Sequence, residues 1–432
     1  MADRTHTEAG DQRAATTAPS GRPRWRVWLL LAAWLLAFAV TRLLPLALTA
    51  DPSLYGPEIS DPTGDVRLYS EWGELIVGEG FAPYREIDIE YPPGSLPFVI
   101  VPALLGQGEF SPTAFVVLLM VLDLVAFVTL LMLARRTGSY RGALTWLVLP
   151  PLLGVVLYAR LDLVPAFATL LALERAHAGR WFAGGVWFGL GAAAKLFPAL
   201  LIPLAFLAAG QRRLGLLGGV AVGVAAAWVP FAADTGEMLE DVLGYHSARG
   251  IHLESLWGSL LNLQRIDGGP VELVFEYGAF HITGPGAPTM LRWTTAISLA
   301  VVAACVLVAL LRWLRWPGLA RAELPLAATT MLALLLGTGR VFSPQFVVWL
   351  LAAAAVLFAV MPRVALWAGP LLAVIVLLTA AGYPLGFDLL RDGARWPALV
   401  LVYRNVAVIA FGLLLMLRWM TGDTAGAAHA DR

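Results

Sequence analysis

The sequence has little charge, one lysine and one cysteine. Only 14% of its 432 residues are Asp, Glu, Lys or Arg, and the formal net charge at pH 7 is zero. This balance excludes the strongly basic surface by which many proteins bind nucleic acids. Cys305 stands alone inside an apolar run, so the chain contains neither a disulfide nor a thiolate metal site. Lys195 is the only lysine, so almost all the basic residues are arginines. This preference, together with abundant Ala and Gly, points to a G+C-rich bacterial genome.

Long apolar runs make up most of the chain, which is 59% hydrophobic with a mean hydropathy of +0.74. They predict an all-α polytopic membrane protein. Residues 95–106 are apolar but short and contain prolines, so we expect a re-entrant or interfacial segment there. About twelve spans are expected, near 26–49, 112–134, 142–158, 162–174, 181–194, 196–209, 214–233, 290–311, 322–338, 345–360, 364–381 and 398–417.

The chain reads as one integral membrane domain, residues 25–419, between two polar tails. Residues 1–24 are small and polar, which predicts a disordered cytoplasmic tail, and residues 420–432 form a second cytoplasmic tail. The first apolar run is too long for a signal-peptide core and shows no clear cleavage site, so we expect it to stay as the first transmembrane helix. No separate soluble domain is expected.

Arginine clusters set the predicted orientation in the bacterial cell membrane. If the loops that carry them are cytoplasmic, the positive-inside rule is obeyed almost throughout, with both termini inside. The segments that then lie on the extracytoplasmic side are the first loop (61–95), the Arg160–Asp162 turn, Lys195, the long loop (234–289), the Arg340–Gln345 turn and the 382–397 loop. We also find no Walker or Rossmann glycine pattern between a strand and a helix, so we expect a donor other than a nucleotide. The clusters are Arg135/Arg136/Arg141, Arg175/Arg180, Arg212/Arg213, Arg312/Arg315/Arg321, Arg363 and Arg418.

The first loop concentrates carboxylates that the rest of the chain lacks. Apolar residues at helical spacing (Leu68, Trp72, Leu75 and Ile76) predict a short amphipathic helix on the membrane surface. Asp65 lies at its start, either as a catalytic base or only as an N-cap, and Tyr69 four residues later shares its face. The carboxylates are Asp61, Asp65, Glu71, Glu74, Glu79, Glu86, Asp88 and Glu90.

Several other charged residues lie between or within apolar runs, where a charge is costly and is by default a functional hypothesis. Arg160 and Asp162 form either a functional pair or a structural ion pair at a helix end. For Asp123, in mid-span, we favour a polar contact between helices. Glu90 and Tyr91 precede two prolines at which the chain re-enters the membrane; the prolines are structural, but Glu90 could face a site.

Lys195 separates two short apolar half-helices and is followed by Pro198. Such a lysine either snorkels to the interface or points into a cavity, where it could hold a phosphate. Arg340, beside Gln345 at a helix junction, is a second phosphate candidate or an interface anchor.

The 234–289 loop contains GYHSARGIHLESLWGS, with two imidazoles, a guanidinium and a carboxylate within nine residues. The His-x-x-Arg-x-x-His spacing of His246, Arg249 and His252 predicts that they lie close to one helical face. An anion site is favoured over zinc, because no third ligand has a firm spacing. The remaining alternative is an ordinary solvated loop. We therefore expect no metal and no cofactor.

Short motifs follow one another along the chain: Asp65-x-x-x-Tyr69, Tyr91-Pro92-Pro93, Arg160-Leu161-Asp162, Lys195-Leu196-Phe197-Pro198, Glu254-Ser255 and Phe342-Ser343-Pro344-Gln345. In their order and common membrane face they resemble glycosyltransferase family 87 of the GT-C superfamily, over about residues 26–418. The resemblance implies a GT-C-like fold and a mannosyltransferase that uses polyprenyl phosphate mannose. Members include actinobacterial enzymes that extend phosphatidylinositol mannosides.

The resemblance further implies inverting transfer with a first-loop aspartate, here Asp65, as general base. It implies that basic residues hold the donor phosphate, a role that we map onto Lys195, His246, Arg249, His252 and Arg340. The other candidate substrate contacts are Tyr69, Glu90, Tyr91, Arg160, Asp162, Glu254 and Gln345. Expected partners are the lipid bilayer, the polyprenyl phosphate sugar and a lipid or glycan acceptor.

Three alternatives stay open from the sequence. Broken helices and intramembrane charges also fit a transporter or flippase for a lipid-linked sugar, although we find no internal repeat. The donor could carry arabinose instead of mannose. A purely structural membrane protein would leave the external charges unexplained.

Overall fold

The computed structural model describes residues 24–56 and 62–422, so Asp61 and almost all of both predicted tails lie outside the described residues. By internal packing the chain divides into residues 1–40 and Thr41–Arg432. The features described below belong to the second unit. Helix α1, Arg24–Ala50, crosses the division.

The described residues are mostly helical, with three short strands. The helices after α1 are α2 Gly64–Gly73, α3 Pro97–Leu105, α4 Pro112–Thr137, α5 Arg141–Val148, α6 Leu163–His177, α7 Trp181–Ala194, α8 Ile202–Ala209, α9 Arg213–Trp228, α10 Thr235–Ala248, α11 Leu256–Ile266, α12 Ala287–Arg315, α13 Ala320–Thr338, α14 Val347–Val360, α15 Pro362–Ala380, α16 Phe387–Arg391 and α17 Arg395–Thr421. The strands are β1 Ile251–His252, β2 Glu272–Glu276 and β3 Ala279–Thr283.

Seven helices of the described part are long and apolar enough to cross a membrane. Three further apolar helices are shorter, among them Pro93–Leu105, whose α-helical part α3 has nine residues, too few to span. The predicted all-α polytopic membrane fold is confirmed. The number of spans, predicted as about twelve, stays a prediction.

Most predicted spans coincide with helices, but the one near 142–158 is wrong as a single α-helix. Helix α5 ends at Val148, because Pro150 and Pro151 offer no amide hydrogens to continue it. A 3-10 segment, Pro150–Leu157, follows, and within it Gly154 adopts φ 59°, which favours glycine. This break leads into the turn that carries Arg160.

Helix α14 is enclosed on all sides by the protein. Its residues from Val347 to Ala359 are all buried, as expected for a helix that is apolar on every side. Nearby, α7 and α9 pack backbone to backbone through glycines. A Cβ on Gly189 would lie 2.3 Å from the carbonyl oxygen of Val220, and one on Gly219 would lie 2.1 Å from that of Phe182. Small residues permit this close approach.

Asp123 of α4 joins α1, α4 and α5, as predicted for a helix–helix contact. Arg42 donates to both of its carboxylate oxygens, at 2.9 and 3.0 Å. The indole of Trp146 and the hydroxyl of Tyr158 each donate at 2.7 Å. All four donors and the carboxylate are buried, so the hydrogen-bonding capacity of this side chain is satisfied within the protein.

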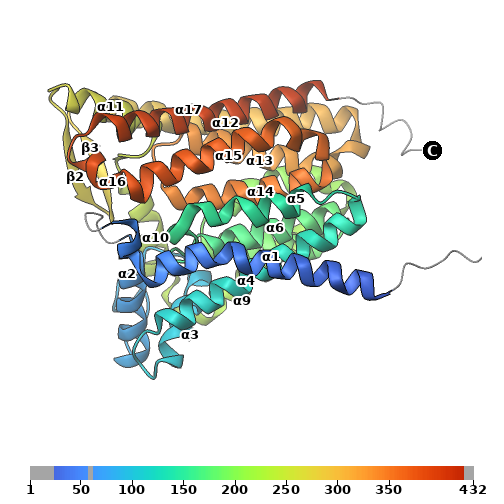
Figure 1. The fold of residues 1–432 in the computed structure, drawn as a ribbon, viewed down its shortest axis with the longest axis horizontal. Helices are drawn as coiled ribbons and strands as arrows, with labels where there is room; N and C mark the ends of the chain where they lie inside the picture. Colours follow the sequence, from blue (N-terminus) through green and yellow to red (C-terminus); the bar gives the residue numbers. More distant parts are fainter. Residues whose placement is uncertain (1–23, 57–61, 423–432) are drawn as a thin grey trace, which may run out of the picture. The chain divides into compact units, whose positions relative to one another are not determined.

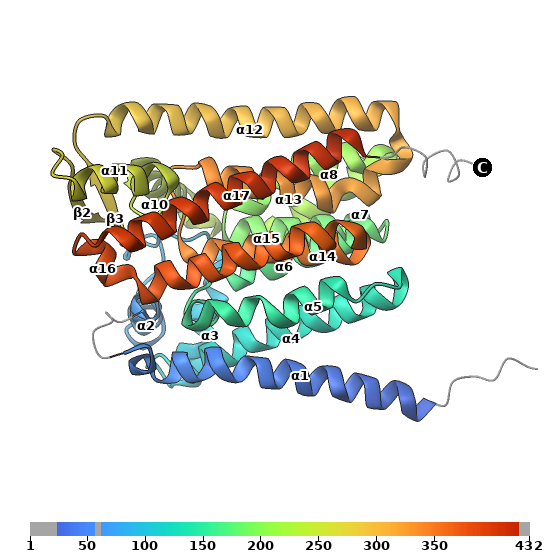
Figure 2. The same cartoon turned by 45° about the horizontal axis from the view of Figure 1, so that its top comes forward.

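The predicted loop 234–289 is folded rather than an irregular solvated segment. It contains α10, α11 and an antiparallel sheet in the order β1-β3-β2, with His252 opposite His281. Leu253, Leu261 and Ile282 of this segment share a buried cluster with Ala398 and Leu401 of α17. Figure 1 shows β2, β3, α10, α16 and α2 gathered at the left end of the view, and Figure 2 shows the same grouping.

Arginines of the predicted cytoplasmic loops connect these loops to one another. Arg136 pairs with Glu174 at 2.7 Å, and Arg141 donates to the carbonyl oxygen of Pro362 at 2.6 Å. Arg212 reaches the carbonyl oxygen of Gly179 at 3.3 Å. The basic loops therefore contact each other, which agrees with a common side of the membrane; which side it is stays a prediction.

Candidate active site

A cavity of about 750 Å³ brings together the polar residues of widely separated segments. It is lined from α2, the loop before Pro92, the 160 and 195 turns, the 245–280 segment, the 340–349 segment and the loop after α15. Eleven of the thirteen predicted site residues face it: Asp65, Glu90, Tyr91, Arg160, Lys195, His246, Arg249, His252, Glu254, Arg340 and Gln345. Their roles stay predictions.

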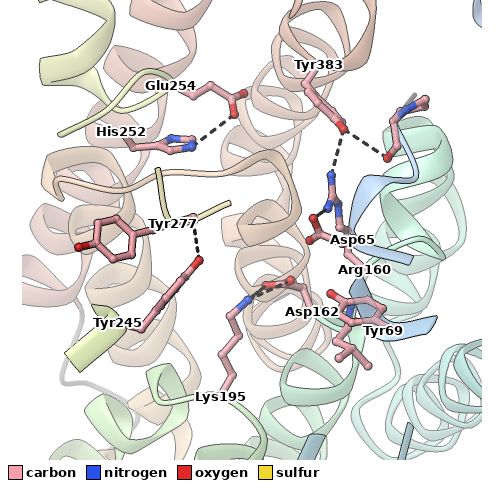
Figure 3. Close-up of polar contacts among 12 residues, drawn as sticks. Asp65, Tyr69, Arg160, Asp162, Lys195, Tyr245, His252, Glu254, Tyr277 and Tyr383 are labelled. Carbon is pink, nitrogen blue, oxygen red and sulfur yellow. Dashed lines mark hydrogen bonds and ion pairs between the residues drawn. The ribbon is translucent and has the colours of Figure 1, made fainter. Parts of the chain in front are cut away.

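Asp65 lies in the first turn of α2 and faces the cavity. The N-cap position belongs to Thr63, so the interpretation of Asp65 as an N-cap is wrong. Its carboxylate forms an ion pair with Arg160, whose guanidinium also donates to the hydroxyl of Tyr383 at 3.0 Å. Tyr383 donates in turn to the carbonyl oxygen of Pro62 at 3.3 Å, which ties the start of the helix to the loop after α15 (Figure 3).

Asp162 pairs with Lys195 and not with Arg160. The two Nζ–carboxylate distances are 2.9 and 3.1 Å, and both side chains are almost fully buried. Helix α7 ends at Ala194 and the backbone of Lys195 is extended, as the two predicted half-helices require. The snorkelling alternative for Lys195 is therefore wrong.

Aromatic rings surround the Lys195 ammonium. Its Nζ lies 5.0 Å from the ring centre of Tyr91, 5.2 Å from that of Phe346 and 5.4 Å from that of Trp349. Ring faces attract a cation and keep water away from it. The aromatic rings and Asp162 thus hold a positive charge at the wall of the cavity.

Tyr69 and Asp162 lie behind the wall instead of facing the cavity. Tyr69 is fully buried, packs against Tyr91 and Phe115, and accepts a hydrogen bond from the amide of Leu161 at 3.5 Å. Tyr69 shares a helix with Asp65, but its side chain lies in the protein interior and not beside Asp65 in the cavity. Both residues support the turn that carries Arg160, and no contact with a substrate is open to Tyr69.

The predicted single helical face of His246, Arg249 and His252 is wrong. Helix α10 ends at Ala248, Arg249 has the extended ψ of 131°, and His252 belongs to β1. The chain turns at Arg249, and all three side chains nevertheless line the same cavity. The segment whose spacing suggests one helix therefore turns at Arg249 and follows the cavity wall.

Arg249, Arg340 and Lys195 supply the positive charge of the cavity. Arg340 donates to the carbonyl oxygen of His246 at 2.7 Å, whereas Nε of Arg249 is buried without a hydrogen-bond partner. Burial, reinforced by the charge of Arg249, lowers the pKa of His252 well below its usual value. The same causes lower that of His281 to about 4. Both imidazoles are therefore neutral at pH 7, and the arginines and the lysine can attract an anion.

Glu254 occupies the bend between β1 and α11, where Ser255 caps α11. Its side chain is almost fully buried and faces the cavity. Burial raises its pKa to about 7, against the opposing charges of Arg404 and Arg160. Within the described residues, no group of three His, Cys, Asp or Glu could hold a metal ion.

Sequence reasoning missed Arg404, Asn405 and a set of aromatic wall residues. Arg404 is buried inside the last apolar span, and its guanidinium lies 4.0 Å from the ring centre of Phe342. A charge within a span is a signal that could have identified it. The aromatic wall residues carry no such signal in a sequence rich in aromatics: Tyr245, Phe275, Tyr277, Phe280, Trp349, Tyr383 and Phe387.

The comparison with protein families agrees with this arrangement. The sequence profile of glycosyltransferase family 87 matches residues 90–344, more than half of the chain. The match includes the cationic part of the cavity and Glu254, whereas Asp65 and Arg404 lie outside it. No curated protein sequence matches the chain. By the extent of the match, this membrane protein belongs to glycosyltransferase family 87.

Proposed function

We propose that the protein transfers a sugar, mannose, from a polyprenyl phosphate donor to a hydroxyl group of a lipid or glycan acceptor. The reaction takes place on the extracytoplasmic face of the bacterial cell membrane and inverts the anomeric centre. One observation carries the proposal: Asp65 faces the same cavity as Lys195, Arg249 and Arg340. A carboxylate for the acceptor and a cationic wall for the departing phosphate are the two elements that such a transfer needs.

The chemistry follows from these groups. Asp65 takes the proton of the acceptor hydroxyl as its oxygen attacks the anomeric carbon, and the bond from that carbon to the phosphate oxygen breaks. The lipid phosphate leaves as an anion, so it needs cations and not a proton donor. Lys195, Arg249 and Arg340 supply fixed positive charge that requires no rearrangement during the reaction.

Inversion requires the acceptor and the phosphate on opposite sides of the sugar. Figure 3 shows Asp65 and Arg160 on one side of the view and His252 and Tyr245 on the other. Arg249, whose guanidinium lies 5.4 Å from the ring centre of Tyr245, belongs to the latter side. This separation supports in-line displacement with Asp65 facing the acceptor. Arg160 holds the Asp65 carboxylate in place through their ion pair.

The test is sugar transfer by the purified protein in nanodiscs. Polyprenyl phosphate mannose is the donor, a membrane lipid extract supplies acceptors, and wild type is compared with Asp65→Asn and Glu71→Gln. Glu71 is the matched control, because it is an exposed carboxylate of the same helix that does not line the cavity. We expect transfer by wild type and Glu71→Gln and none by folded Asp65→Asn.

The other outcomes separate the parts of the proposal. Transfer by Asp65→Asn at the wild-type rate would keep the reaction and exclude Asp65 as its base; Glu90, whose pKa burial raises, would then be tested. Transfer only from polyprenyl phosphate arabinose would change the sugar. Absence of transfer from both donors by folded wild-type protein would exclude the proposed function.

A further inference from the structure

Glu254 has a backbone that is fixed from a distant helix. Its carbonyl oxygen accepts a hydrogen bond from Arg404 and a second, at 3.1 Å, from the side-chain amide of Asn405. Both donors belong to α17, about 150 residues further along the chain. They are fully buried, and Arg404 also lies against the ring of Phe342. The position of Glu254 in the cavity wall is thus set by a rigid contact.

The side chain of Glu254, by contrast, is held only by two long contacts, to Arg404 and His252. Its Oε1 is buried without a hydrogen bond. The nearest basic side chains are the Arg404 guanidinium, 4.0 Å from Oε1, and the neutral imidazole of His252, whose Nε2 lies 4.0 Å from Oε2. These distances exceed hydrogen-bond length. A buried carboxyl group that faces a cavity and has an oxygen without a hydrogen bond can accept or donate one to a ligand in that cavity.

The surroundings favour the uncharged form of this carboxyl group. An ionised carboxylate that is buried without hydrogen bonds is costly, and the neutral His252 beside it offers no charge. The raised pKa of Glu254, about 7, agrees with this description. The charged groups that face it are Arg404 of α17 and Arg160 of the turn before α6, and both oppose the shift without cancelling it.

We propose that Glu254 binds the sugar that is transferred, and that its protonated carboxyl group donates a hydrogen bond to a hydroxyl of that sugar. The inference rests on the proposed function and adds the residue that recognises the sugar. Glu254 lies near Arg160, the partner of Asp65, on one side and near His252, beside the cationic groups, on the other. A sugar bound between the base and the phosphate would lie between these two sides, next to Glu254.

The chemistry of the ligand decides between a sugar and the phosphate itself. A carboxyl group and a sugar hydroxyl can each donate and accept a hydrogen bond, so they satisfy one another. A carboxylate would repel the phosphate that Lys195, Arg249 and Arg340 attract. Protonation allows Glu254 to contact the sugar beside this anion without that repulsion. Arg404 and Asn405 act as positioning residues, since they touch Glu254 and do not line the cavity.

The proposal predicts that transfer weakens as Glu254 ionises. Transfer efficiency, kcat/KM, should fall above about pH 7, by about tenfold per pH unit at the steepest. Glu254→Gln keeps the size of the side chain, and its amide can donate and accept hydrogen bonds at every pH. We expect this variant to retain most of the transfer measured at about pH 6 and to lose the alkaline decline.

The experiment measures transfer of the donor sugar from about pH 5 to about pH 9 for wild type, Glu254→Gln, Glu254→Ala and the Glu71→Gln control. Glu254→Ala should lose at least about tenfold in kcat/KM relative to wild type at about pH 6, where Glu254 is protonated, because the sugar hydroxyl then has no partner. Glu71→Gln should keep the wild-type profile. As a substrate-free readout, the infrared carbonyl band of a protonated carboxyl group should titrate near neutral pH in wild type and be missing from Glu254→Gln.

Each result bears on one claim. An unchanged alkaline decline in Glu254→Gln, or loss of its transfer at all pH values while it stays folded, would overturn the role of Glu254 and leave the sugar transfer established. If the variant does not fold, the infrared titration of wild type decides: lack of a band that titrates near neutral pH overturns the inference. Absence of any transfer by wild type would remove the proposed function and this inference with it.

Discussion

Substitution of Asp123 tests whether a buried charge in this membrane protein has a structural or a functional role. An ionisable residue in the middle of a span is by default a functional hypothesis. Here, however, the carboxylate accepts two hydrogen bonds from Arg42, one from Trp146 and one from Tyr158, all between 2.7 and 3.0 Å. Asp123 does not line the cavity. We therefore expect its substitution to lower stability and to leave the chemistry intact.

The magnitude follows from the contacts. Asp123→Leu removes one partner of a buried ion pair and leaves the Arg42 guanidinium without its carboxylate, at a cost of about 3–5 kcal/mol. Replacing both residues by leucine removes the stranded charge, and such apolar replacements of buried pairs are often close to neutral. The double variant should therefore recover part of the stability that Asp123→Leu loses; the buried donors of Trp146 and Tyr158 still lack their acceptor.

Thermal unfolding in detergent, scanned at one fixed rate, measures these differences beside the transfer assay. Leu124→Ala is the control, because Leu124 is an exposed apolar neighbour on the same helix. Asp123→Leu should melt several degrees below wild type, and the double variant between the two, with transfer retained in the folded fraction of each. Normal melting of Asp123→Leu together with lost transfer would refute the structural interpretation.

Three further predictions concern the cavity and the packing beside it. Lys195→Met should abolish transfer and strand Asp162, whereas Lys195→Met/Asp162→Asn should melt near wild type and still not transfer, so recovered transfer would exclude a role for the ammonium. Gly94→Ala should cost about 1–3 kcal/mol in thermal unfolding, since its Cβ would lie 2.7 Å from the carbonyl oxygen of Ala193; unchanged melting would contradict this. Because folding raises the pKa of Glu254 from 4.5 to about 7, wild type should lose stability relative to Glu254→Gln as pH rises through this interval, and parallel melting curves would contradict it.

Much of the helical fold could be predicted because apolar runs and proline positions report it directly. The first half-helix ends at Ala194, directly before Lys195, and the second begins at Phe197, directly before Pro198. The prediction failed where a backbone break depended on tertiary packing, as in the 3-10 segment around Gly154. A run of apolar residues carries the same hydropathy whether it forms one helix or two shorter pieces.

The residues of the site were easier to predict from the sequence than the ion pairs that they form. The sequence marks Asp65, Arg160, Asp162 and Lys195 as charges beside membrane spans, but it suggests that Arg160 and Asp162 pair with each other. In the structure each pairs with a residue from another segment. Spacing along the chain constrains local faces only, and ion pairs between distant helices depend on packing that the sequence does not display.

The hydrogen bonds that each buried carboxyl group accepts distinguish the roles of Asp123, Asp162 and Glu254 better than their depth of burial does. Asp123 has four donors and no access to the cavity, which suits a group that fixes helices. Asp162 is bound by Lys195 and lies behind the wall, where it can orient a cation. Glu254 faces the cavity with an unpaired oxygen. Of these three, Glu254 alone combines an oxygen without a hydrogen bond and access to the cavity, so it is the one for which a ligand is the simplest physical explanation.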